Sequence, residues 1–65
     1  MDLHIKRANK ITSKDWIFLT NSSQVITAHL VKNVLDVMGD GSKLKIITED
    51  SEHLTVDKRD FILSA

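Results

Sequence analysis

The stretch that decides the fold runs from Val34 to Val56 and reads VLDVMGDGSKLKIITEDSEHLTV. It contains three runs rich in β-branched and aliphatic residues, at 34–38, 43–48 and 53–56, separated by polar segments at 39–42 and 49–52. Runs of this length, bounded by Gly, Asp, Ser and Glu, are typical of strands joined by tight turns. The stretch therefore predicts a three-strand antiparallel meander and a β-rich class.

The preceding segment, residues 23–38, carries two conflicting signals. Its larger apolar residues recur at helical spacing, which is typical of an amphipathic helix. Six β-branched residues in the same segment lower its helix propensity. We therefore expect strand at 24–27, one helical turn near 28–32 and strand at 34–38. The alternative, an α+β fold with a helix over 23–38 packed on a four-stranded antiparallel sheet, stays open.

The N-terminal half predicts a further hairpin, and its first segment is compatible with two structures. Residues 15–20 are rich in aromatic and β-branched side chains, and 24–27 can return as their partner after the turn formers Asn21, Ser22 and Ser23. In such a strand Trp16 and Phe18 share one face, and Ile17 and Leu19 the other. Residues 3–7 alternate with period two, so 1–14 is either an edge strand or a loose basic arm.

The order of these elements, closed by the apolar run Phe61-Ile62-Leu63, resembles a small SH3-like or Sm-like barrel. That resemblance implies an antiparallel barrel of about five strands. Over residues 16–63 the spacing is similar to the small flagellar-operon FlbD-type proteins, in which a Leu-Thr strand, an Asn-Ala-x-Leu-Ile turn and an Ile-x-Leu strand recur. The chain departs from them at 21–23, where they tend to carry Asn-Gly, and at Thr27, where they carry asparagine. The first 15 residues have no counterpart, and the resemblance implies a fold without an activity.

Size and composition limit how such a chain reaches stability. Its 65 residues suit one domain over 1–65, which buries only about 60% of the surface of its unfolded chain. The absence of cysteine excludes disulfides and cysteine-based zinc sites. With 42% hydrophobic residues, some apolar side chains are expected to meet a partner or a second copy, and a homo-oligomer is as well supported as a monomer. No apolar run reaches the length of a membrane span, and residues 1–7 lack a signal-peptide core, so we expect a cytoplasmic protein without a membrane partner.

No motif in the chain points to catalysis or to a cofactor. The three histidines, His4, His29 and His53, are far apart and lack metal-binding spacing. There is no cysteine nucleophile and no Gly-x-Ser-x-Gly elbow. The Gly39-Asp40-Gly41 run fits a hairpin turn better than a phosphate or calcium loop. We therefore expect no enzyme activity, no metal and no cofactor.

Charge is distributed unevenly along a chain whose net charge is zero. Residues 1–33 hold five basic and two acidic side chains, and residues 34–65 hold four basic and seven acidic ones. The basic segment beside the single tryptophan is the candidate interaction surface, because lysine, arginine and an exposed aromatic can contact a partner. By elimination, the expected function is that of a small regulatory protein that binds another protein. Nucleic-acid binding is the alternative. The candidate residues are Lys6, Arg7, Lys10, Lys14 and Trp16.

Overall fold

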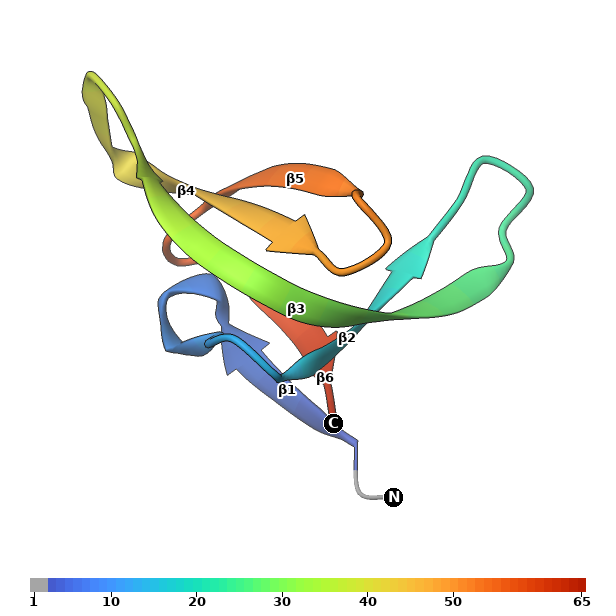
Figure 1. Cartoon of the computed structure of the whole chain (residues 1–65). Helices are drawn as coiled ribbons and strands as arrows, with labels where there is room; N and C mark the ends of the chain where they lie inside the picture. Colours follow the sequence, from blue (N-terminus) through green and yellow to red (C-terminus); the bar gives the residue numbers. More distant parts are fainter. Residues whose placement is uncertain (1–2) are drawn as a thin grey trace.

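The longest strand, β3 (Ile26–Val37), passes through the whole molecule and pairs with β2 along its first part and with β4 along its second. The computed structural model, which describes residues 3–65, has six antiparallel strands in one sheet with the spatial order β1-β6-β2-β3-β4-β5 (Figure 1). The mainly β class predicted from the sequence is confirmed. In chain order the other elements are β1 (His4–Arg7), the 3₁₀ turn η1 (Ala8–Lys10), β2 (Trp16–Thr20), β4 (Asp40–Thr48), β5 (His53–Asp57) and β6 (Phe61–Ser64).

The continuity of β3 corrects the prediction for residues 23–38. Both the helical turn near 28–32 and the alternative helix over 23–38 are wrong, because this strand is unbroken from residue 26 to residue 37. Its pairing register shifts between Val31 and Asn33, as it does at a β-bulge. A bulge inserts one residue, so Val31 and Val34 both reach the core although they lie three positions apart. The bulge thus produces the spacing that resembles a helix.

A single core lies inside the curled sheet, and this arrangement fits a small barrel-like fold. Alternate residues of β4 and β6 point into it, and Ile17 of β2 is completely buried. The turn η1 packs beside the loop between β5 and β6, where the N–H of Ala8 donates to the carbonyl of Asp60 at 2.7 Å and the N–H of Asn9 to that of Lys58 at 3.2 Å. The only helical element in residues 3–65 is therefore this turn at 8–10. The core comprises Ala8, Ile11, Ile17, Val31, Leu44, Ile46 and Ile62, with Leu19, Val34, Leu54 and Val56 packed against it.

The meander predicted over 34–56 is present, with a shorter first turn. Strand β4 begins at Asp40, so the chain reverses at Met38 and Gly39 rather than over 39–42. Gly39 has a φ of +82°, a left-handed conformation that glycine adopts without steric cost. In the second hairpin Leu44 lies opposite Val56 and Ile46 opposite Leu54, as the shared phase of the pleat predicts.

Strand β1 raises the strand count from about five to six and lies at one edge of the sheet. It pairs with β6 in the register His4 to Ser64 through Arg7 to Phe61, so it brings the first part of the chain beside the last (Figure 1). Across residues 3–65 there is no helix of the length and apolarity needed to cross a membrane.

Candidate functional site

The five residues predicted as an interaction surface do not lie on one face of the sheet. Lys6 and Arg7 are consecutive in β1, so their side chains point to opposite faces. Lys10 is exposed in η1, and Lys14 lies in the turn before β2 with a left-handed φ of 74°. Trp16 begins β2 and leaves 42% of its surface exposed. Of the predicted set, therefore, only Arg7 and Trp16 share a face of paired strands.

Lys6 is partly neutralised by Asp15, whose carboxylate lies 3.5 Å from the lysine Nζ. The same carboxylate accepts the backbone N–H of Thr12 at 2.9 Å. That backbone hydrogen bond is the main cause that lowers the pKa of Asp15, with the charge of Lys6 adding to it. Arg7 is held differently, with its guanidinium 4.6 Å from the centre of the Phe61 ring and donating to the carbonyl of Arg59. Lys6 is thus positioned by a residue nine positions along the chain, and Arg7 by residues more than fifty positions away.

The face that carries Arg7 and Trp16 is mostly apolar. Because Ile17 and Ser64 are buried toward the core, the residues next to them along β2 and β6 point away from it. Trp16 and Ala65 exchange two backbone hydrogen bonds, which aligns β2 with β6 on this side. The registers with β1 and β3 extend the same side across four strands. We call it the outer face; it comprises Ile5, Arg7, Trp16, Phe18, Thr20, Ile26, Ala28, Leu30, Phe61 and Leu63.

Three large apolar side chains of the outer face are strongly exposed. Ile5 is 70% exposed, Ile26 63% and Phe61 62%. Phe18, Leu30 and Leu63 fill the space between them and are half-buried on the side away from the core. A soluble monomer rarely exposes a contiguous apolar surface that spans several strands, and surfaces of this kind mark interaction sites. The sequence predicted that Trp16 and Phe18 share a face, but not that β1, β3 and β6 add apolar residues to it.

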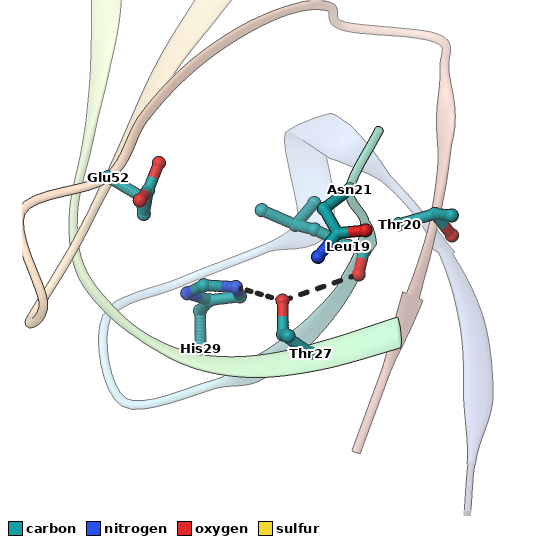
Figure 2. A pocket seen from close by; sticks show the side chains of 6 residues that line it. All are labelled: Leu19, Thr20, Asn21, Thr27, His29 and Glu52. Carbon is teal, nitrogen blue, oxygen red and sulfur yellow. Dashed lines mark hydrogen bonds between the residues drawn. The ribbon is translucent and has the colours of Figure 1, made fainter. Parts of the chain in front are cut away.

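A pocket of about 350 Å³ opens on the other side of the β2–β3 hairpin. Figure 2 shows Thr27, His29 and Asn21 gathered around it, with Glu52 reaching in from the β4–β5 side. Asn21 is fixed by its side-chain oxygen, which accepts the N–H groups of Ser23 at 2.8 Å and Val25 at 3.0 Å. The complete lining is Leu19, Thr20, Asn21, Thr27, His29 and Glu52.

A chain of hydrogen bonds runs along one wall of this pocket. His29 Nδ1 lies 2.8 Å from the Asp50 carboxylate, and its Nε2 lies 2.7 Å from the Thr27 hydroxyl. A hydrogen bond from the Thr48 hydroxyl is the main cause that lowers the pKa of Asp50, and His29 contributes less. A charged carboxylate only accepts, so Nδ1 carries a proton; when the imidazole is neutral, its Nε2 accepts from Thr27. His29 keeps only 10% of its side chain exposed, whereas the Asp50 side chain is 56% exposed.

The order carboxylate, imidazole, hydroxyl is also that of hydrolase triads. Here, however, the hydroxyl oxygen of Thr27 also lies 3.5 Å from the carbonyl of Leu19, so two acceptors compete for one proton (Figure 2). The network joins the middle of β3 to the turn between β4 and β5, across more than twenty positions of sequence. Because no local spacing links His29 with Asp50, the sequence analysis missed this pair. In the part of the chain that the structure describes, no cluster of three or more His, Asp or Glu side chains could hold a metal ion.

Comparison of the chain with protein-family models, with curated protein sequences and with solved structures found no match. The resemblance to FlbD-type proteins therefore stays a prediction, and functional proposals for this chain rest on its own geometry.

Proposed function

We propose that this chain is a non-catalytic small regulatory or interaction protein that binds a protein partner through the outer face. The observation that carries the proposal is the exposure of Ile5, Trp16, Ile26 and Phe61 on one continuous side of four paired strands. Trp16 lies in an interior strand of that surface, with neighbours on both sides. Buried aromatic anchors dominate the binding energy of protein interfaces, so Trp16 is the expected hot spot.

The free-energy cost of leaving apolar side chains exposed supports a binding function for the outer face. Every exposed apolar side chain forgoes the stabilisation of about 1.5–3 kcal/mol that full burial provides. Among residues 3–65 only seven apolar residues are buried in the core, so the fold has little stability to spare. A face that leaves its aromatic and branched side chains in water is consistent with burial against a partner.

Charge favours a protein partner over nucleic acid. Binding to nucleic acid draws most of its affinity from several lysines and arginines that contact phosphates along one surface. The outer face carries a single basic side chain, Arg7, and Lys6 points to the opposite side, toward Asp15. An apolar face rimmed by few charges matches the centre of a protein interface instead.

Affinity capture with matched variants tests the proposal. Wild-type chain and the variants Trp16→Glu and Lys43→Glu are immobilised and incubated with extract from the native host. Lys43 is exposed on β4, away from the outer face, and serves as the control. We expect partners that are retained by wild type and by Lys43→Glu but lost with Trp16→Glu. Equal retention by all three chains would contradict a role for the outer face.

Two further measurements test the rest of the proposal. Quenching of Trp16 fluorescence by generic oligonucleotides that weakens steeply with salt and is lost in Lys10→Glu would replace it with the nucleic-acid alternative. Hydrolysis of p-nitrophenyl acetate that is lost in His29→Gln and kept in His53→Gln would overturn the non-catalytic assignment. We expect neither result.

A further inference from the structure

We propose that the protein partner supplies an extended segment that pairs with the free edge of β1 and alternates apolar with acidic side chains. This inference rests on the proposed function, since it names the part of the partner that meets one border of the outer face. It adds a mode of binding, β-strand addition, to the apolar contact described above.

The backbone of β1 offers hydrogen-bonding groups on its free side. In an antiparallel pair, residues alternate between those that bond the partner strand and those whose N–H and C=O groups point away from it. The N–H of Ala8 bonds the carbonyl of Asp60, which continues the register of β1 with β6 by one residue. By alternation Lys6 also bonds β6, and the N–H groups of Ile5 and Arg7 point toward the free edge. Within residues 3–65, no other strand pairs with that edge.

The length of this edge limits what can bind. Strand β1 has four residues, and η1 follows it immediately, which turns the chain toward the core. An added strand therefore pairs with Ile5 at its centre and with little beyond Arg7. A short segment fits such an edge better than the strand of a large second sheet.

Side chains along the edge select an alternating partner. Ile5 lies on the outer face beside Leu63, so a residue placed opposite Ile5 extends that face and is expected to be apolar. Lys6 and His4 point to the other side of the strand, and Lys6 keeps 34% of its side chain exposed. Acidic residues on either side of the apolar one lie across from these two side chains: Lys6, which Asp15 only partly neutralises, attracts one, and an imidazole N–H of His4 can donate a hydrogen bond to the other. Arg7, held over the Phe61 ring, adds a positive charge at the end of the edge.

The same charges argue against a second copy of this chain as the occupant. Antiparallel self-pairing centred on Lys6 places two lysines face to face, and pairing centred on Ile5 places Lys6 opposite His4 and gives it no acidic partner. Like charges directly opposite each other destabilise a strand pair. Lysine on an edge strand is a device against self-association, and it leaves an acidic strand as the favoured partner.

The opposite edge of the sheet provides an internal comparison. Strand β5 carries no lysine or arginine and ends at Asp57, whereas β1 carries both Lys6 and Arg7, so an acidic segment is attracted less to the free edge of β5. A segment that alternates apolar and acidic residues should therefore bind the edge of β1 in preference to the edge of β5. That discrimination is a sharper signature than binding alone.

Two-dimensional NMR on the full chain, with synthetic peptides as probes, tests the inference. The first probe alternates valine and glutamate, the second alternates valine and lysine, and the third is the first with alternate backbone amides methylated. We expect the valine–glutamate peptide to slow hydrogen exchange at the amides of Ile5 and Arg7 at least about tenfold, while amides of β5 are unchanged. The other two peptides should bind at least about tenfold more weakly, since one has the wrong charge and the other lacks donors.

Point variants distinguish a failure of strand addition from a failure of outer-face binding. Lys6→Glu should weaken the valine–glutamate peptide about tenfold, whereas Lys43→Glu should not, and the NMR spectra of both variants report whether they are folded. Protection at β5, protection by all three peptides alike, or no protection at Ile5 and Arg7 would overturn strand addition. If Trp16→Glu still abolishes partner capture in that case, the proposed function stands without this mode of binding. If the peptide protects the β1 amides but the Trp16→Glu variant still retains the partners, the outer-face proposal fails and strand addition at the β1 edge stands.

Discussion

His29 Nδ1 lies 2.8 Å from the carboxylate of Asp50, and this contact ties the middle of β3 to the turn between β4 and β5. The Thr48 hydroxyl donates to the same carboxylate, and Thr48 is itself almost completely buried. A turn that sequence alone shows as a solvated acidic segment is therefore joined to the strand that passes through the whole fold. Two of the predictions below follow from this connection.

Asp50→Asn should change how stability responds to acid. The hydrogen bond from Thr48, helped by His29, holds the pKa of Asp50 below the ordinary aspartate value of 3.8. The stability that this carboxylate provides is complete above that value, and it is lost as the pH falls through the lower pKa of the folded state. Urea unfolding at a series of pH values should show a shallower loss in acid for Asp50→Asn than for wild type. Asp15 and Asp40, whose pKa values are also lowered, account for the slope that remains.

Thr48→Val should destabilise the second hairpin more than Thr48→Ser does. The Thr48 hydroxyl accepts the backbone N–H of Glu52 at 3.0 Å and donates to Asp50. Valine keeps the shape but leaves that N–H and the carboxylate without this partner, a loss worth about 1–3 kcal/mol. Serine keeps the hydroxyl and removes only a methyl group, which costs about 1 kcal/mol. Thermal or urea unfolding of the two variants checks the order, and a larger loss for serine would show that packing outweighs hydrogen bonding here.

Two isoleucines separate the contributions of the core and the outer face. Ile17 is fully buried in β2, whereas Ile26 at the start of β3 is 63% exposed. Ile17→Ala should lower the free energy of unfolding by about 2–5 kcal/mol, and the upper end of that range would unfold so small a domain. Ile26→Ala should cost less than about 1 kcal/mol. If the Ile26 variant were equally damaging in dilute solution, the outer face would already be covered in the free protein.

The two glycines test the turn between β3 and β4. A methyl group added at Gly39 or at Gly41 meets no atom within 4 Å, so steric contact is the same for both. Only Gly39 has a left-handed φ, +82°. Gly39→Ala should therefore cost about 1–2 kcal/mol, while Gly41→Ala should be close to neutral. Unfolding measurements on the pair isolate backbone conformation from packing, and equal effects would place the strained position elsewhere in the turn.

The second hairpin shows how far local patterns reach. Its strands, its phase and its polar turn were all predictable, because alternation of apolar and polar residues is a property of neighbours in sequence. The error at residues 28–32 has the opposite origin. A bulge at positions 31–33 puts two inward side chains three residues apart, and a single sequence cannot distinguish that spacing from one turn of helix.

The candidate site, too, was predictable only in part. The position of Trp16 next to a basic segment was visible in the sequence, and so was its place beside Phe18 on one side of a strand, whereas its exposure was not. The remainder of the outer face comes from Ile5, Ile26 and Phe61, which belong to three other strands. Their gathering depends on the register of β6 with β1 and β2, which lie more than forty positions away in the sequence, and on the register of the β2–β3 hairpin. No periodicity within one segment reports that register.

The sequence by itself therefore determined the β class, the hairpin from β4 to β5 and which residues of β2 share a face. Each of these follows from alternation over a few residues, and local side-chain packing on a pleated strand enforces it. Tertiary structure alone decided that β3 is one bent strand, that the side chains of Lys6 and Arg7 lie on opposite faces of a paired strand, and that four strands share an exposed apolar face. These features arise from hydrogen bonds between distant segments, whose energies depend on pairing partners that no local pattern names.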